Sequence, residues 1–280
     1  MDYHLPVLID EVIKTLKPDS TKTFVDCTLG NGGHTKKLLE LGAKIIAFEA
    51  DKNNIEIVKN RIQDPRLTII NDNFVNLSKH LTDKVDGILF DLGLSVNQQK
   101  ADNRGFSFND ENSLDMRLDP TNQELTAEEI INTYSYEQLF DIFSKISQEK
   151  LSKPLAIRII SSRKHHPIKT ATRLADIIRS FYKEKHIRTS IDPATKIFMA
   201  LRIVVNNEFE NLKSALNQTL NLVKPSGTVC VISFHSGEDR IVKQFIREHH
   251  LKNTMSLPSQ EEIQSNPLSR SSVLRCFQIE

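Results

Sequence analysis

Short apolar runs alternate with amphipathic stretches along the first third of the chain. The apolar runs predict buried β-strands, and the stretches between them predict helices. The expected strands are 21–30, 43–50, 66–71 and 86–93, and the expected helices are 36–42 and 51–62. Strands that alternate with helices over short connections predict an α/β fold with a parallel, doubly wound sheet.

The next strand pattern comes only after a long helical stretch. Four segments carry apolar residues at spacings of three and four, which is typical of helices packed on one side: 126–134, 135–146, 153–164 and 171–185. Asp192 and Pro193 then predict the start of a longer helix, with Asp as the cap. Further strands are expected at 223–235 and 271–280. The pattern therefore predicts a helical domain at 113–199, inserted into a core formed by 1–112 and 200–280.

Composition and charge narrow the class of protein. The chain is 39% hydrophobic and 26% charged, as expected for a soluble globular protein, and its net charge of +1 indicates no particular partner. No secretory signal or apolar stretch of transmembrane length is visible, so we expect a cytoplasmic protein without membrane contact. Cys27, Cys230 and Cys276 form no C-x-x-C pair. We expect them to be buried reduced thiols, and we expect no metal site.

The helical insertion is divided by charge. Residues 101–142 contain ten Asp or Glu and two Lys or Arg, whereas residues 151–188 contain two Asp or Glu and ten Lys or Arg. The basic half fits either a solvated helix face or a surface for RNA phosphates, with Arg163, Lys164 and Arg173 as candidate contacts.

In an open parallel sheet, ligands bind beyond the carboxyl ends of the strands. The segment "DCTLGNGGHT" follows the first strand and brings glycines that let a ligand approach the backbone. It is not a G-x-G-x-x-G motif, because the sixth position from Gly30 is Thr35, and a dinucleotide site is therefore disfavoured. Glu49 ends the second strand, where an acidic side chain can accept both hydroxyls of a ribose. Asp91 ends the fourth strand.

Several further motifs carry a resemblance to a known family. The chain reads "HLPVLIDEV", "VDCTLGNGGH", "DGILFDLGLS", "RGFSF", "LDMR", "PATKIFMALRIVVNNE" and "VISFHSGEDRIVK", and then "NPLSRSSVLR", in this order. These motifs resemble those of the bacterial ribosomal RNA cytosine-N4 methyltransferase family, the MraW/RsmH type, nearly from end to end. The resemblance implies a class I, Rossmann-like methyltransferase core with an inserted helical domain for substrate recognition.

The resemblance also implies an activity and a site. The family transfers a methyl group from S-adenosylmethionine to the exocyclic amine of a cytidine in the decoding centre of the small ribosomal subunit. The partner would be ribosomal RNA or the small subunit, and a homodimer is left open. By position in the motifs, the cofactor contacts would be Gly32, Gly33, His34, Glu49, Phe74, Asp91 and Gln98. The candidate substrate contacts are Ser95, Arg104, Arg117, Ser233, His235 and Arg240.

Asp91 is also the candidate catalytic residue. Amino-methyltransferases place a polar residue after the fourth strand, where it can accept a hydrogen bond from the target amine, and the alternative is that Asp91 only holds the cofactor. A side chain at Gly32 is expected to fill space that the cofactor needs. Phe106 and Phe108 would stack on bases or form a small local core.

The chain departs from the usual family sequence at several places. Glu49 stands where the family usually has Asp, and "SVNQ" stands where it usually has "SSPQ". "FHSGED" and "NPLSRS" replace "FHSLED" and "NPRARS", and the linker 250–256 is short. These departures concern substrate contacts more than cofactor binding.

The stretch "VISFHSGEDR" also contains residue types of a hydrolase triad. It lacks G-x-S-x-G around Ser236, which disfavours that reading. Ser236 and Asp239 have the spacing of a helix cap, so we expect a helix that begins with Ser236 as the cap. Two alternative functions remain for the whole chain: a non-catalytic RNA-binding or ribosome-assembly factor on the same fold, and a nicotinamide-dependent oxidoreductase, which the glycine pattern disfavours.

Overall fold

The structure is a computed structural model that describes residues 5–95, 97–98 and 103–280. The chain forms two compact units. The first contains the residues before 97 together with Phe209–Glu280, and the second is Asn97–Glu208. The expected division at 112/113 and 199/200 falls inside the second unit, which therefore begins earlier and ends later than the apolar pattern indicated.

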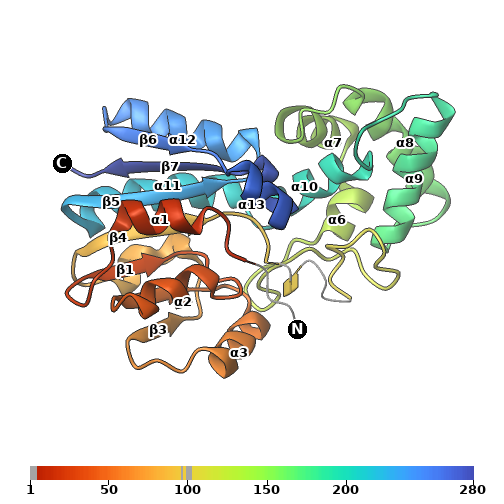
Figure 1. Cartoon of the computed structure of the whole chain (residues 1–280). Helices are drawn as coiled ribbons and strands as arrows, with labels where there is room; N and C mark the ends of the chain where they lie inside the picture. Colours follow the sequence, from red (N-terminus) through yellow and green to blue (C-terminus); the bar gives the residue numbers. More distant parts are fainter. Residues whose placement is uncertain (1–4, 96, 99–102) are drawn as a thin grey trace. The chain divides into compact units, whose positions relative to one another are not determined.

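The first unit is built on a seven-stranded sheet of order β3-β2-β1-β4-β5-β7-β6 (Figure 1). Its strands are β1 Thr23–Asp26, β2 Lys44–Phe48, β3 Leu67–Ile70, β4 Val85–Asp91, β5 Val223–Ser233, β6 Asn253–Ser256 and β7 Val273–Gln278. The first five are parallel, and β7 and β6 are antiparallel additions. The predicted α/β class is confirmed, but the sheet is mixed rather than fully parallel.

Helices cover both faces of this sheet. One face carries α1 Ile9–Leu16, α2 Gly33–Glu40 and α3 Lys52–Arg61, of which α1 and α2 lie in front of the strands in Figure 1. The other carries the short η1 Phe74–Asn76 and α4 Leu77–His80, then α11 Glu208–Leu222 and α12 Ser236–Glu248. A short α13 Gln260–Ser265 and η3 Pro267–Ser271 precede β7.

Alternation along the strands supplies both cores, because successive side chains of a strand point to opposite faces. Phe90 and Val231 pack on the α11 and α12 side, whereas Leu89 and Cys230 pack on the α1 and α2 side. The three cysteines are buried, as expected. Cys230 lies opposite Cys276 on β7, with 2.7 Å between their sulfur atoms.

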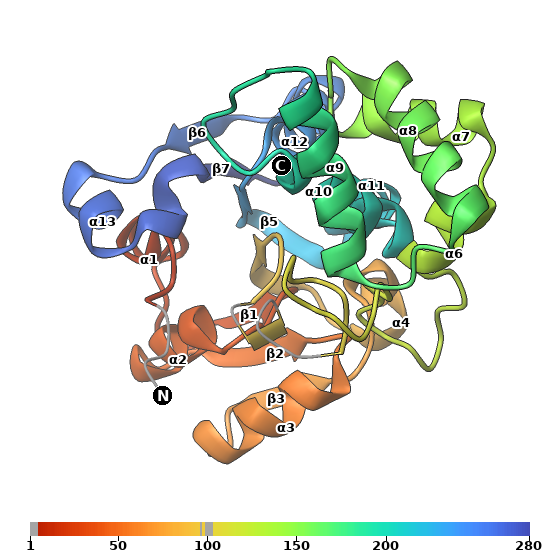
Figure 2. The ribbon, with the colours of Figure 1, turned by 90° about the vertical axis from the view of Figure 1, so that its right-hand side faces the viewer.

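The second unit is helical (Figure 2). Its helices are α6 Ala127–Thr133, α7 Tyr136–Asp141, the π-helical η2 Ile142–Ile146, α8 Ser152–His165, α9 Ala171–Glu184 and α10 Ala194–Val205. Their apolar stripes meet in one core, against which Phe106 and Phe108 also pack. The rings of Phe108 and Phe198 meet edge-on, with 4.7 Å between their centroids. These aromatic residues therefore contribute to a local core.

Arg163 has a structural role that its place in the basic segment did not indicate. Its guanidinium donates hydrogen bonds of 2.6 Å to the carbonyl oxygens of Ile131 and Tyr134, at the end of α6. The last carbonyls of a helix lack partners within the helix, so the arginine satisfies them and ties α8 to α6. Lys164 and Arg173 are exposed.

We predict that Arg163→Ala lowers the free energy of unfolding by about 1.5–3 kcal/mol, because hydrogen bonds from a charged donor are lost. The matched control is its exposed neighbour, Lys164→Ala, which should stay within about 0.5 kcal/mol of the parent protein. Urea unfolding followed by circular dichroism measures both. Equal stability of the two variants would contradict this role for Arg163.

Candidate active site

Polar residues gather where the parallel strands end. The carboxyl ends of β1, β2, β3, β4 and β5 share one edge of the sheet, and the strand order reverses between β1 and β4. Ligands of such sheets bind at this switch point. The predicted cofactor residues of the first unit, from the glycine turn to Asp91, all belong to this edge.

The turn after β1 is fixed by hydrogen bonds. Asp26 is buried and accepts hydrogen bonds from the hydroxyl of Thr35 at 2.7 Å and the backbone N–H of Thr28 at 3.1 Å. Burial raises the pKa of Asp26, and these hydrogen bonds lower it in part. The Thr28 hydroxyl accepts from the backbone N–H of Asp91 at 2.6 Å. The ends of β1 and β4 are therefore joined directly.

Gly32 caps α2 in a left-handed conformation, with φ of 73°. A Cβ at this position would lie 2.7 Å from Cδ1 of Ile62 and 3.3 Å from Cγ1 of Val58. The expectation that a side chain here would only fill ligand space is therefore incomplete, because it would also strain the backbone and meet α3. The glycine is required by the turn itself.

Glu49 folds back toward the glycine turn. Its Oε2 accepts from the backbone N–H of Gly30 at 3.1 Å and from Nδ2 of Asn54 at 2.8 Å, and its Oε1 accepts from the N–H of Asp51 at 2.9 Å. The side chain is buried, and burial raises its pKa to about 7, against the opposing effect of these hydrogen bonds. The carboxyl group can thus accept hydrogen bonds from ribose hydroxyls best when it is ionised.

His34 connects the amino-terminal segment to Asp91. Its Nε2 lies 3.0 Å from the carbonyl oxygen of Val7, and its Nδ1 lies 3.4 Å from Oδ2 of Asp91. A carbonyl oxygen can only accept, so Nε2 carries a hydrogen, and Nδ1 faces a second acceptor. Burial disfavours the imidazolium, but Asp91, Asp26 and the Val7 carbonyl raise the pKa of His34 above its ordinary value.

The second carboxylate oxygen of Asp91 has no such partner. Among the residues that the structure describes, Oδ1 of Asp91 is buried without a hydrogen bond. A buried polar atom without a partner is costly, and such atoms at a site are explained by a missing ligand or water. This oxygen is an acceptor held in place by His34 at the switch point.

The end of β5 supplies further polar atoms. The hydroxyl of Ser233 and Nε2 of His235 are buried without hydrogen-bond partners within the described ranges. Nδ1 of His235 accepts a hydrogen bond of 3.4 Å from the backbone N–H of Glu238, so Nε2 carries the hydrogen of a neutral ring. Oε1 of Glu238 lies 3.1 Å from Nε2, but not in hydrogen-bonding geometry.

The cap of α12 differs from the predicted one. His235, not Ser236, is the cap, and it forms a capping box with Glu238. Oε2 of Glu238 also accepts from the backbone N–H of Phe234 at 2.8 Å. The imidazole accepts at the position where a serine hydroxyl usually does, which the preference for small polar caps could not indicate. Arg240 is exposed on this helix.

The remaining predicted residues lie in different surroundings. Phe74 packs its ring edge-on against Phe90 at 5.6 Å and is only partly buried. Ser95 follows β4. Its Cβ lies 3.6 Å from the position that a Cβ would take if Gly30 were replaced by a larger residue. Gln98 is buried and belongs to the helical unit.

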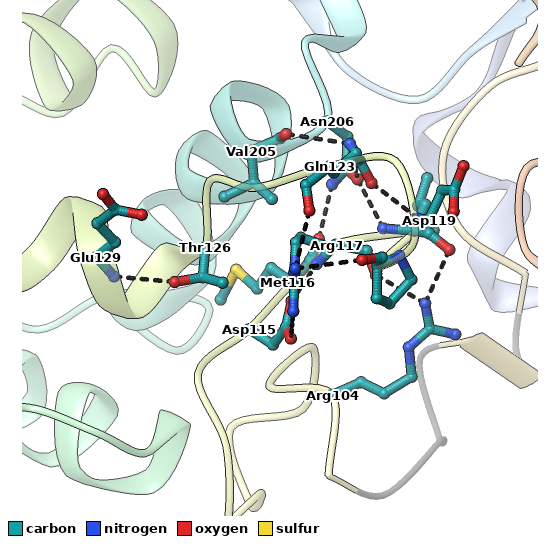
Figure 3. A network of polar contacts seen from close by, with 12 residues as sticks. Arg104, Asp115, Met116, Arg117, Asp119, Gln123, Thr126, Glu129, Val205 and Asn206 are labelled. Carbon is teal, nitrogen blue, oxygen red and sulfur yellow. Dashed lines mark hydrogen bonds and ion pairs between the residues drawn. The ribbon is translucent and has the colours of Figure 1, made fainter.

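Arg104 and Arg117 belong to a polar network in the helical unit (Figure 3). Arg117 pairs with Asp115, at 2.7 Å from Nε to Oδ1, and donates to the carbonyl of Gln123 at 2.8 Å. Arg104 donates to the carbonyls of Arg117 and Leu118. The side chain of Asn206 joins this loop to α10 by accepting from the N–H of Leu118 at 2.8 Å and donating to the carbonyl of Met116 at 2.8 Å. Both guanidinium groups thus order the loop, and any phosphate contact would be additional.

Sequence reasoning missed Val7, Thr28 and Asn54. Val7 acts through its backbone carbonyl, Thr28 through a hydroxyl on a backbone N–H, and Asn54 through an amide on Glu49. Val7 and Thr28 lie in the quoted motifs "HLPVLIDEV" and "VDCTLGNGGH", whereas Asn54 lies in none of them. In the described part of the chain, no group of three or more His, Cys, Asp or Glu side chains is arranged to hold a metal ion. No described helix is long and apolar enough to cross a membrane.

Comparison with known proteins identifies the family of the chain. A family model described as the MraW methylase family matches residues 1–280. A protein of Hydrogenobaculum sp. named ribosomal RNA small subunit methyltransferase H is 40% identical, over 99% of this chain and 96% of its own. A protein of the same name from Halothermothrix orenii is 38% identical over 97% of each chain. An rRNA methylase structure from Streptococcus thermophilus is more distant, with a TM-score of 0.47 and 11% identity over 97% of this chain and 94% of its own.

The family match covers the glycine turn, Glu49, the His34–Asp91 pair and the strand ends that hold them. The chain is therefore an S-adenosylmethionine-dependent methyltransferase that belongs to the MraW methylase family.

Proposed function

We propose that this chain methylates the exocyclic N4 amine of a cytidine in the decoding region of small-subunit ribosomal RNA. Curated relatives with near-complete coverage carry the name ribosomal RNA small subunit methyltransferase H, which supports ribosomal RNA as the substrate. The observation that carries the proposal is the buried, unpartnered Oδ1 of Asp91 at the switch point, beside the glycine turn.

The chemistry of an exocyclic amine explains the need for such an oxygen. The amine of cytosine is a poor nucleophile because its lone pair is delocalised into the ring. An acceptor for its hydrogen, such as Oδ1 of Asp91, localises the lone pair and receives a proton as the methyl group arrives. His34, with a pKa raised by Asp91, holds the other carboxylate oxygen and so orients the acceptor.

The cofactor would occupy the edge formed by β1, β2 and β4. The turn that contains Gly32 and Gly33 would lie beside the cofactor, and Glu49 would accept hydrogen bonds from the ribose hydroxyls. S-adenosylmethionine supplies an electrophilic methyl group on its sulfonium, and this chain supplies position and a proton acceptor. Well-oriented reacting atoms about 3–3.5 Å apart can account for roughly 7–11 kcal/mol of a barrier.

The end of β5 would contact the base. Nε2–H of His235 is a donor, and Oδ1 of Asp91 is an acceptor, at the ends of adjacent parallel strands. Cytosine pairs an amine donor with an acceptor at its neighbouring ring nitrogen, whereas uracil presents the reverse pattern. This complementarity supports cytosine. The base must leave any stack to reach the sheet edge.

The proposal as a whole is tested by methyl transfer from tritiated S-adenosylmethionine to small subunits that lack this modification. Nucleoside mapping should then recover N4-methylcytidine at one position. Transfer to a different base or to no RNA would overturn the proposed substrate, while the methyltransferase assignment would stand.

We predict that cofactor affinity rises about tenfold between pH 6 and pH 8, because the Glu49 carboxyl has a pKa of about 7 and its ionised form accepts ribose hydroxyls. At a pH below this raised pKa the carboxyl is protonated and has lost an acceptor, so cofactor affinity is lower there. Calorimetric titration of S-adenosylhomocysteine across this range measures the effect. Glu49→Gln should bind more weakly and lose this pH dependence, and an unchanged dependence in that variant would assign it to another group.

Asp91→Asn should lower turnover at saturating S-adenosylmethionine by at least about 10²-fold, the lower range for a positioned acid–base group. Single-turnover methylation across a cofactor series separates this from weaker binding. Asp83→Asn, an exposed carboxylate before the same strand, is the control and should have normal turnover. Full recovery of Asp91→Asn at high cofactor would leave Asp91 as a binding residue only.

For the basic segment, we predict that Lys164→Gln with Arg173→Gln weakens binding of small-subunit ribosomal RNA. The log–log salt slope should fall by roughly 0.7–0.9 for each lost phosphate contact, while cofactor affinity is unchanged. Lys145→Gln, which removes an exposed charge outside the segment, is the control. An unchanged slope in the double variant would make α8 and α9 a solvated face.

A further inference from the structure

Residues 5–8 lie across the beginning of α2, at the candidate site. The Val7 carbonyl oxygen accepts the hydrogen bond from Nε2 of His34. A Cβ on Gly33 would lie 3.1 Å from Cβ of Pro6, so the proline packs directly on the glycine turn. The segment therefore forms one wall around His34, and its position decides where the Val7 carbonyl points.

Two side chains from the other end of the chain hold this segment. Oε1 of Glu262, on α13, accepts a hydrogen bond of 2.7 Å from the backbone N–H of Leu8. Nδ2 of Asn266, which is 2% exposed, donates a hydrogen bond of 3.0 Å to the carbonyl oxygen of Leu5. The two contacts enclose Pro6 and Val7.

The segment depends on such external support. Leu8 has φ of 53° and ψ of 34°, a left-handed conformation that a leucine seldom adopts. It is the N-cap of α1, yet its side chain cannot cap the helix. A strained backbone of this kind persists where the surrounding structure holds it, and Glu262 contacts the N–H of this same residue.

We propose that Glu262 and Asn266 are positioning residues for methyl transfer. They hold residues 5–8 so that the Val7 carbonyl accepts from Nε2–H of His34, which orients the protonated ring so that Nδ1–H donates to Oδ2 of Asp91. Which nitrogen of a histidine serves a functional partner is set by the hydrogen bond of the other nitrogen. The inference rests on the proposed function, because it takes the His34–Asp91 pair as part of the active site.

The effect must pass through the segment. Burial lowers the pKa of His34, and the groups that raise it are Asp91, from β4, Asp26, from β1, and the Val7 carbonyl. Glu262 contacts the N–H of Leu8, which belongs to the same peptide group as the Val7 carbonyl, and Asn266 contacts the Leu5 carbonyl. Removing either side chain should thus alter His34 through the backbone, not through charge.

The experiment compares Glu262→Ala with Glu262→Gln in the full chain. Glutamine keeps an oxygen that can accept from Leu8, so it should behave as the parent protein. Alanine should release the segment and increase amide hydrogen exchange in residues 5–12. The His34 imidazole, assigned by its loss in His34→Gln and followed by NMR, should then titrate at lower pH. Turnover at saturating cofactor should fall by about 10-fold to 10²-fold, the range for misplacement of a reacting group by about 1 Å.

Two further variants complete the test. Glu261→Ala removes an exposed carboxylate from the same helix and should change none of these measurements. Asn266→Asp preserves shape but removes the donor to Leu5, and should reproduce Glu262→Ala.

Three results would contradict the positioning role or the proposed site. Faster exchange in Glu262→Ala with an unchanged His34 titration and unchanged turnover would overturn the positioning role and leave a purely structural contact. Equal loss in Glu262→Gln and Glu262→Ala would overturn the hydrogen bond to Leu8 as the cause. Normal cofactor binding and turnover in His34→Gln would instead overturn the proposed site, and the positioning role with it.

Discussion

The parallel pairing of β1 with β4 is the constraint on which the site depends. Because the two strands run in the same direction, Asp91 and the glycine turn emerge side by side, and the Thr28 hydroxyl joins them through the N–H of Asp91. His34, on the first turn of α2, then lies within reach of the carboxylate. None of these contacts is local in sequence. They exist because the order of strands reverses at this point.

Much of the fold was predictable because burial imposes a period on the sequence. The continuous apolar run within "DGILFDLG" follows from a strand buried on both faces, and the apolar stripe of α9 follows from one core below it. β6 was missed because its sequence, "NTMS", lies at an exposed edge where nothing demands apolar residues. The antiparallel direction of β7 also left no trace, since the apolar pattern of a strand does not depend on its direction relative to its neighbour.

Side-chain roles were less predictable than positions. Residue type and motif order indicated Glu49, His34 and Asp91 as site residues, but could not indicate that Glu49 folds back onto Gly30 or that His235 caps α12. Arg163 illustrates the reason. A basic residue in a basic segment fits a phosphate, yet its guanidinium is used on the carbonyls of α6. Such choices depend on which acceptors the folded chain leaves open.

The contacts of residues 5–8 have a consequence for the order of assembly. Leu8 and Glu262 are separated by 254 positions, and Leu5 and Asn266 by 261. During synthesis the amino-terminal segment leaves the ribosome first, long before α13 exists. The strands β1 to β4 can pair earlier, but the wall around His34 closes only when nearly the whole chain has been made. The candidate site is therefore completed later in synthesis than the strands that carry it.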